Sequence, residues 1–204
     1  MNKNNIDKLK YEYEQLANGC KLIAGADEVG RGPLAGPVVC ACVIMPLNDI
    51  IDGIDDSKKV SEKKREKLYD LIIEKAIAYS IQFVYEDEID KINILNATKK
   101  CMATAINSMK VKPDVCLVDA LDKLDTSVPL VPIIHGDALS YNIGAASILA
   151  KVTRDRFMVK QDTLFPEYGF AKHKGYGTAV HMKALREIGP CKIHRRSFIK
   201  FLGE

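Results

Sequence analysis

The chain reads GADEVGRGPLAGPVV from Gly25 to Val39, with apolar segments on both sides of the glycine-rich centre. Residues 21–27 (KLIAGAD) predict a short strand, and residues 36–45 (GPVVCACVIM) predict a longer strand that is continuously apolar and therefore buried. Glycines and prolines punctuate the link between them, so we expect the two strands to form a hairpin. Asp27 and Glu28 close the first strand, directly before the turn.

Further apolar runs follow the hairpin at intervals along the chain. We expect strands at residues 80–85, 114–119 and 128–134, the last at a sheet edge because it contains two prolines. Helices are expected at residues 61–78, with Ser61 as the N-cap, and at residues 88–110, 145–160 and 178–188. A hairpin followed by strands that helices separate predicts an α/β fold with a mixed sheet and a basic, helical carboxy-terminal tail.

Composition is that of an ordinary globular protein. Of the 204 residues, 47% are hydrophobic and 28% are charged, which argues against a disordered, collagenous or coiled-coil chain. No apolar run approaches the roughly 20 residues that span a bilayer, and residues 1–10 lack the apolar core of a signal peptide. We therefore expect one cytoplasmic domain over residues 1–204, with no membrane partner. The six cysteines contain no Cys-x-x-Cys pair, so neither a zinc site nor a disulfide framework is expected.

Charge is distributed unevenly along the chain. Residues 1–150 carry 18 basic and 22 acidic side chains, whereas residues 151–204 carry 12 basic and 5 acidic ones. This asymmetry suggests a polyanionic partner on one side and a cation-binding site on the other. Charge alone is equally compatible with a solubilising face.

Four acidic residues, Asp27, Glu28, Asp119 and Asp137, stand where predicted strands end. Carboxylates brought together there would repel one another and raise one another's pKa unless divalent cations neutralised them. An all-carboxylate set favours Mg²⁺ or Mn²⁺. Consecutive strand side chains face opposite sides, so Asp27 and Glu28 share a site only if the turn at residues 30–32 bends the chain. Singly, each is better explained as a turn residue; together they indicate a metal site.

These segments, taken in order, resemble the ribonuclease HII family. Residues 25–39 are similar to its amino-terminal signature and DSKK at residues 56–59 to its next motif, while residues 145–155 are similar to its long helix. Residues 165–176 and 194–198 are similar to its carboxy-terminal motifs. The blocks span residues 21–200. The resemblance implies a ribonuclease H-like fold, with a mixed five-stranded sheet flanked by helices and a basic helical extension, at about residues 165–204, that binds substrate.

The resemblance also implies an activity. The family cuts RNA in RNA–DNA hybrids and incises 5′ of ribonucleotides embedded in duplex DNA, leaving 3′-hydroxyl and 5′-phosphate ends. Its catalytic, metal-binding carboxylates fall on Asp27, Glu28, Asp119 and Asp137. Two Mg²⁺ or Mn²⁺ ions about 3.5–4 Å apart would activate water and support the leaving oxygen. We expect a monomer whose partners are these nucleic acids. His135 stands where bacterial relatives usually carry lysine, which leaves the role of that side chain open.

Substrate-binding residues follow from the same resemblance. The main chain of Gly30, Arg31 and Gly32 would read the 2′-hydroxyl, with Arg31 against a phosphate, and Tyr176 would stack on the next deoxyribose. The other predicted substrate-binding residues are Ser57, Lys58, Lys59, Ser147, Lys151, Arg195 and Arg196, of which Lys58, Lys59, Arg195 and Arg196 would contact phosphates. Without the resemblance, these residues have structural explanations that fit equally well. Gly30–Gly32 would form a tight turn, Tyr176 would pack against the protein, the lysines and arginines would be solvated charges, and Lys151 would form an ion pair with Asp155.

Other functions are less well supported by the sequence. The sister family, ribonuclease HIII, usually has an extra amino-terminal domain, whereas the first motif begins here at about residue 25. A hybrid-binding module with a decayed site would not need all four carboxylates. The sequence contains no Gly-x-x-x-x-Gly-Lys-Ser/Thr loop, so it does not indicate a kinase or a GTPase. We expect His173, His181 and His194 to be packed or surface residues, because no spacing supports zinc.

Overall fold

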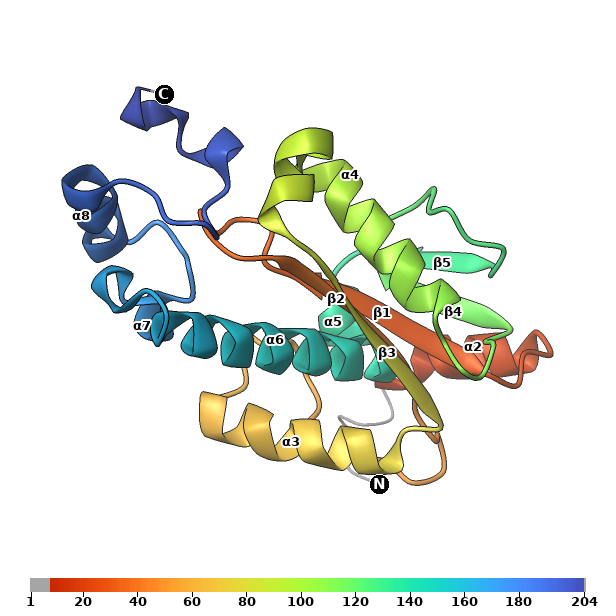
Figure 1. The fold of residues 1–204 in the computed structure, drawn as a ribbon. Coiled ribbons are helices and arrows are strands. Elements are labelled where there is room, and N and C mark those ends of the chain that lie inside the picture. Colours follow the sequence, from red (N-terminus) through yellow and green to blue (C-terminus); the bar gives the residue numbers. More distant parts are fainter. Residues whose placement is uncertain (1–7, 204) are drawn as a thin grey trace.

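The structure is a computed structural model that describes residues 8–203 (Figure 1). Most of the polar segment 1–10, and both ends of the predicted 1–204 domain, lie outside the described residues. Within residues 8–203, no helix combines the length and the apolar character that crossing a membrane requires.

A mixed five-stranded sheet forms the centre of the fold. Its strands are β1 (Ile23–Val29), β2 (Val38–Ile44), β3 (Ala78–Val84), β4 (Val115–Asp119) and β5 (Leu130–Ile133), in the spatial order β3-β2-β1-β4-β5. β1 pairs antiparallel with β2 and parallel with β4, and β5 runs parallel to β4 at the edge. The predicted hairpin, edge strand and mixed sheet are therefore confirmed. Because β1, β4 and β5 run in the same direction, their carboxyl ends meet at one edge of the sheet.

Helices cover both faces of this sheet. They are α2 (Lys10–Ala17), α3 (Glu62–Lys75), α4 (Glu86–Asn107), α5 (Gly136–Leu139), α6 (Tyr141–Asp162), α7 (Phe170–His173) and α8 (Ala179–Ile188). α4 packs on one face, where alternate β2 residues such as Cys40 and Cys42 join its core. α6 packs on the other face with Val39, Ala41 and Val43, and α3 lies against α6 (Figure 1). The cysteines of the first face are free thiols buried as small apolar side chains.

Several boundaries differ from the predictions for local reasons. α6 begins at Tyr141 rather than residue 145 because the Ser140 side chain caps it by accepting from the Ile143 N–H. Ser61 occupies the predicted N-cap position of α3, but its side chain makes no capping hydrogen bond. α4 is interrupted at Asn93, whose backbone has φ 65° and ψ 164°. The short helices α2 and α5 were not predicted.

The carboxy-terminal segment wraps around a separate apolar cluster beyond the end of α6 (Figure 1). Three short 3-10 helices, η1 (Pro166–Tyr168), η2 (Arg196–Phe198) and η3 (Lys200–Leu202), accompany α7 and α8 there. A β-bridge between Ala35 and His194 attaches this segment to the loop that follows β1. His173, His181 and His194 are all buried, and the Nε2 atoms of His181 and His194 lie 2.9 Å apart, as expected for packed histidines.

Candidate active site

The four predicted carboxylates lie at the carboxyl edge of the parallel strands. Asp27 and Glu28 are near the end of β1, Asp119 is the last residue of β4, and Asp137 is in the first turn of α5. Asp27 and Asp137 are almost fully buried. The negative charge of Asp119 acts on each of the other three, raising their pKa values. The fold therefore brings together four acidic residues that are distant in the sequence.

Burial and mutual repulsion disfavour the ionised form of these carboxyls. Burial raises the pKa of Asp27 well above its ordinary value, and Glu28 and Asp119 raise it further. The Ser147 side chain and the Glu28 N–H, which donates to Asp27 Oδ1 at 2.8 Å, partly oppose this rise in pKa. Burial also raises the pKa of Glu28, although Arg31, whose Nη1 lies 3.4 Å from Glu28 Oε1, lowers it.

Asp27 and Glu28 approach the site from opposite faces of the sheet. Asp27 pairs with Ala41, which packs on the α6 face, and Glu28 pairs with Cys40, which packs on the α4 face. The β1–β2 ladder stays regular through Val29. The expected bend that would bring Glu28 to the Asp27 face is therefore not present. The site instead straddles the end of β1, where Asp119 influences both side chains.

Asp137 is held close to Asp119 by the backbone of the β5–α5 connection. The Gly136 N–H donates to Asp119 Oδ1 at 2.8 Å. His135, with a left-handed backbone (φ 59°, ψ 37°), turns the chain into α5 and leaves its own side chain exposed. A Cβ atom on Gly136 would lie 2.6 Å from Ile143 Cδ1, so only glycine fits there without a shift. This packing fixes the position of the residue that precedes Asp137.

The chemistry of this cluster fits a hard divalent cation. All four side chains offer carboxylate oxygens, the donors that Mg²⁺ and Mn²⁺ prefer. Glu28 Oε2 is buried and has no hydrogen-bond partner among residues 8–203, so it is available as a ligand. In the same described range, no three acidic, histidine or cysteine side chains stand in an arrangement that could hold a metal ion.

The loop that carries the DSKK motif places charged side chains beside the four carboxylates, and one of them, Asp56, was not among the predicted site residues. Burial raises the pKa of Asp137, and Asp56 is the strongest of the neighbouring carboxylates that raise it further. Lys58 Nζ lies 3.8 Å from Asp137 Oδ2, and the Lys58 side chain is 80% exposed. Partial burial lowers the pKa of Lys58, but Asp56, Asp137 and the other acidic residues outweigh this and raise it. In the sequence, Asp56 stood out only as the first residue of the DSKK motif. Lys59 is exposed nearby.

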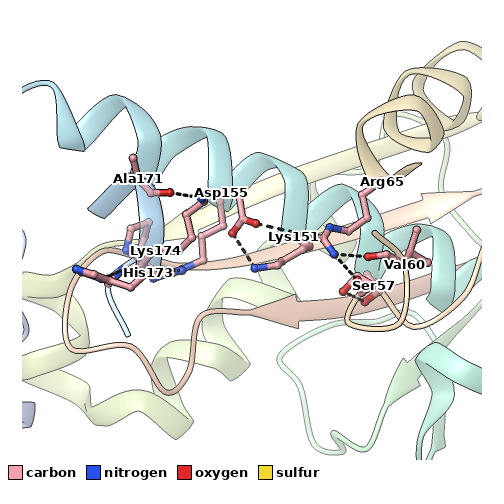
Figure 2. A network of polar contacts seen from close by, with 12 residues as sticks. Ser57, Val60, Arg65, Lys151, Asp155, Ala171, His173 and Lys174 are labelled. Carbon is pink, nitrogen blue, oxygen red and sulfur yellow. Dashed lines mark hydrogen bonds and ion pairs between the residues drawn. The ribbon is translucent and has the colours of Figure 1, made fainter. Parts of the chain in front are cut away.

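Three of the predicted substrate-binding residues on the α6 side are engaged within the protein. The hydroxyls of Ser57 and Ser147 are buried and lie 3.0 Å apart. Ser147 also lowers the pKa of Asp27, and its bond to Ser57 joins α6 to the DSKK loop, so neither hydroxyl forms an open surface. Lys151 Nζ pairs with Asp155 Oδ1 at 2.8 Å, so the expected ion pair is present (Figure 2). Arg65 also reaches Asp155 and the Ser57 carbonyl, which ties α3 to the loop (Figure 2).

Arg195 corrects a prediction. Its side chain is 0% exposed, and its guanidinium donates to backbone carbonyls of the glycine turn, so it cannot contact a phosphate. The neighbouring Arg196 is exposed, and its backbone N–H donates to Asp90 Oδ2 at 2.7 Å. Arg154, which was not among the predicted site residues, is also fully buried.

The glycine turn and Tyr176 lie side by side. A Cβ on Gly32 would be 3.8 Å from Tyr176 Cε1, and the tyrosine ring is 42% exposed. Gly30, at φ +96°, has the left-handed backbone that favours glycine. Arg31 is exposed next to Glu28. One surface therefore combines the turn, an aromatic ring and the acidic cluster.

Comparisons with known proteins agree with this architecture. The family model described as Ribonuclease HII matches residues 24–201. Ribonuclease HII of Acetivibrio thermocellus is 54% identical over 93% of this chain and 74% of that protein. Ribonuclease HII of Caldicellulosiruptor saccharolyticus is 50% identical over 96% of both chains.

Solved structures share the fold. Ribonuclease H2 from Pyrococcus horikoshii superposes with a TM-score of 0.74 at 29% identity, covering 90% of this chain and 98% of that one. RNase HII of Archaeoglobus fulgidus, solved in complex with PCNA, gives 0.73 at 27% identity, with 86% and 94% covered. Bst-RNase HIII in complex with Mn²⁺ gives 0.61 at 15% identity, covering 82% and 63%, and shows likeness of fold alone. The expected ribonuclease H-like fold is confirmed. The chain therefore belongs to the ribonuclease HII family, and it is a metal-dependent ribonuclease that hydrolyses phosphodiester bonds.

Proposed function

We propose that this member of the ribonuclease HII family cuts the RNA strand of RNA–DNA hybrids and also incises 5′ of single ribonucleotides embedded in duplex DNA, leaving 3′-hydroxyl and 5′-phosphate ends. Family membership supports the endoribonuclease activity on hybrids. The observation that carries the finer proposal is the meeting of four carboxylates with the glycine turn and Tyr176 at one edge of the sheet.

Asp27, Glu28, Asp119 and Asp137 are the proposed metal ligands and catalytic residues. Two Mg²⁺ or Mn²⁺ ions held there would activate a water molecule and neutralise charge on the phosphate and the leaving oxygen. The chain orients the ligands itself: the Glu28 N–H and Ser147 hold Asp27, and the Gly136 N–H holds Asp119. No side-chain nucleophile is required, which fits a site built from carboxylates.

Recognition of ribose is assigned to the turn at Gly30–Gly32. The carbonyls of Gly30 and Arg31 accept hydrogen bonds from inside the protein. In the described part of the chain, the N–H groups of Arg31 and Gly32 donate to no protein acceptor, so they are available to a 2′-hydroxyl. The 2′-hydroxyl is the group that distinguishes RNA from DNA. Tyr176, beside Gly32, would pack on the neighbouring sugar.

Phosphate contacts are proposed for exposed cations around this edge. Arg31, Lys58, Lys59 and Arg196 are exposed and come from three separate segments. The segment at about residues 165–204, which belongs to the basic end of the chain, would bind the duplex within a single catalytic domain. We further propose that the protein acts as a monomer in the cytoplasm.

A cleavage assay tests this function. The substrate is an end-labelled DNA duplex with one ribonucleotide, incubated with Mg²⁺, with Mn²⁺ or with EDTA. The expected result is a single metal-dependent cut on the 5′ side of the ribonucleotide, which yields a 3′-hydroxyl end. An all-DNA duplex of the same sequence is the control and should stay intact. A long RNA–DNA hybrid is assayed in parallel, and cleavage of that hybrid without cleavage at the single ribonucleotide would reject the finer proposal.

A further inference from the structure

Two buried arginines support the loop at residues 30–37, here called the glycine loop. Arg154 comes from α6, and Arg195 precedes η2 in the carboxy-terminal segment. Both side chains are 0% exposed, although the guanidinium group is one of the most costly groups to bury. Burial lowers the pKa of Arg154 to about 10 and that of Arg195 to about 9. The contacts of the two guanidinium groups must therefore offset the cost of burying them.

Arg195 holds the glycine loop at its two ends. Its Nη2 donates to the Gly30 carbonyl at 2.6 Å and its Nη1 to the Arg31 carbonyl at 3.0 Å. Its Nε donates to the Gly36 carbonyl at 2.9 Å. Because these carbonyls point inward to the guanidinium, the turn between Gly30 and Gly32 has one defined shape.

Arg154 joins the same loop to the segment that carries Tyr176. Its Nη2 and Nε donate to the carbonyls of Ala35 and Pro37 at 3.0 and 2.9 Å. Its Nη1 donates to the Lys174 carbonyl at 2.9 Å, two residues before Tyr176. The guanidinium carbon lies 6.0 Å from the centre of the tyrosine ring. One side chain therefore sets the spacing between the turn and the ring.

Only arginine can make this set of contacts. Its planar fork sends donors in fixed directions, whereas a lysine ammonium is a compact point charge on a flexible stem. All six of the hydrogen bonds described above for the two guanidinium groups end on backbone carbonyl oxygens. They therefore fix main-chain geometry. The backbone bond from the Leu34 N–H to the Gly175 carbonyl, at 2.9 Å, supports the same arrangement.

We propose that Arg154 and Arg195 are positioning residues for ribonucleotide recognition. Arg195 shapes the Gly30–Gly32 turn that reads the 2′-hydroxyl, and Arg154 fixes the distance from that turn to Tyr176. The inference rests on the proposed function of the site and adds two residues that touch neither metal nor substrate. The two arginines are expected to have different effects. Arg195 affects cleavage of every ribonucleotide substrate, whereas Arg154 affects cleavage where Tyr176 senses the junction with DNA.

Kinetics of Arg154→Lys and Arg195→Lys test the proposal on two substrates, a long RNA–DNA hybrid and a DNA duplex with one ribonucleotide. Arg195→Lys should lower kcat/KM on both by about 10- to 100-fold, since a small misplacement of the turn suffices. Arg154→Lys should lower kcat/KM mainly at the single ribonucleotide, and change the ratio of the two kcat/KM values about tenfold. Arg156→Lys is the matched control, because Arg156 lies on the same helix but is exposed and pairs with Glu66. It should leave both values unchanged.

Mn²⁺ affinity and melting temperature, measured on each variant, distinguish positioning from loss of the fold. A folded Arg154→Lys variant with normal Mn²⁺ affinity and an unchanged substrate ratio would overturn the proposal. If that variant does not fold, Gly175→Ala replaces it, because a Cβ there would lie 2.5 Å from the Ala35 carbonyl oxygen and push the same two segments apart. It should shift the substrate ratio in the same direction, and an unchanged ratio would again overturn the proposal. Failure of the unsubstituted protein to cut either substrate would instead reject the proposed function.

Discussion

Asp119 Oδ1 accepts a hydrogen bond from the Gly136 N–H at 2.8 Å, so the end of β4 is tied to the residue that precedes Asp137. This bond joins two acidic residues that lie far apart in the sequence. It also uses only Oδ1 of Asp119, and Oδ2 accepts no hydrogen bond from residues 8–203, so it is available as a ligand. The charge of Asp119 raises the pKa of Asp27, of Glu28 and of Asp137. Its charge therefore acts on all three of the other carboxyls.

Asp119→Asn should abolish cleavage while leaving the fold intact. The amide oxygen of the substituted side chain can still accept from the Gly136 N–H, but the charge that holds a divalent cation is lost. Since metal stabilisation of the transition state is worth several kcal/mol, kcat should fall by about a thousandfold or more. Duplex binding, measured by fluorescence anisotropy, should change little. Asp114→Asn, at the other end of β4, is the control and should cut normally. Near-normal turnover of Asp119→Asn would refute the assignment.

The raised pKa of Asp27 predicts a trade-off between stability and function. A carboxyl whose pKa is higher in the folded than in the unfolded protein destabilises the fold once it is ionised. This effect is absent at pH values below the unfolded pKa, grows as the pH rises from the unfolded to the folded pKa, and is complete above the folded pKa. In EDTA at neutral pH, Asp27→Asn should therefore melt higher than the parent, by about 2–4 °C for each kcal/mol gained.

The same argument gives the control for Asp27→Asn. Near pH 4 the difference in melting temperature between the two proteins should shrink, because the parent carboxyl is protonated. Addition of Mn²⁺ at neutral pH should raise the melting temperature of the parent more than that of the variant. Equal melting temperatures at both pH values would show that Asp27 carries no electrostatic strain.

Gly30→Ala should damage both stability and cleavage. A Cβ atom there would lie 2.4 Å from Arg154 Nε and 2.7 Å from the Pro37 carbonyl oxygen, at a backbone φ of +96°. We expect a loss of about 2–4 kcal/mol in the free energy of unfolding, measured by urea denaturation. Gly19→Ala is the matched control, because Gly19 has φ +91° and a Cβ atom there would meet nothing within 4 Å. Equal losses for the two variants would mean that backbone strain alone, and not the Arg154 contact, makes Gly30 necessary.

Tyr176→Ala should weaken cleavage at a single ribonucleotide more than cleavage of a long hybrid. Stacking of an aromatic ring on nucleic acid contributes about 1–3 kcal/mol, so kcat/KM at the junction should fall about tenfold or more. Tyr13→Ala controls for loss of an exposed tyrosine, since Tyr13 is also 42% exposed but lies on α2. Unchanged cleavage at the junction would remove Tyr176 from the site.

Binding of the duplex should weaken as salt rises, because cations of the protein replace counterions on the phosphates. Lys58→Ala should lower affinity for all sequences and reduce the slope of log K against log salt by about 1. Lys10→Ala, an exposed lysine on α2, should leave the slope unchanged. A slope that does not respond to Lys58→Ala would exclude a phosphate contact for this residue.

Short apolar runs were enough to predict the sheet and its acidic ends. β1 and β2 are apolar because both of their faces are covered, and the parallel strands bring Asp27 and Asp119 to one edge. Local sequence could not predict α2. Its buried Glu12 accepts from the Ser140 hydroxyl at 2.6 Å and the Asn142 N–H at 2.9 Å, partners that lie far along the chain.

The roles of adjacent arginines were equally hidden from the sequence. Arg195 and Arg196 are identical residues in one basic run, yet one is buried under the glycine turn and the other is exposed. Only tertiary packing distinguishes them. The side from which Glu28 approaches the site depends on where the β1–β2 ladder ends, and the sequence suggested a bend that the regular ladder does not make.

The most direct test of the metal site is anomalous diffraction from crystals that contain Mn²⁺ and a duplex with an uncleavable linkage at the scissile position. Two anomalous peaks about 3.5–4 Å apart are expected between Asp27, Glu28, Asp119 and Asp137, each bound by carboxylate oxygens. Anomalous peaks only at other positions, or no peak among these four side chains, would contradict the proposed metal site.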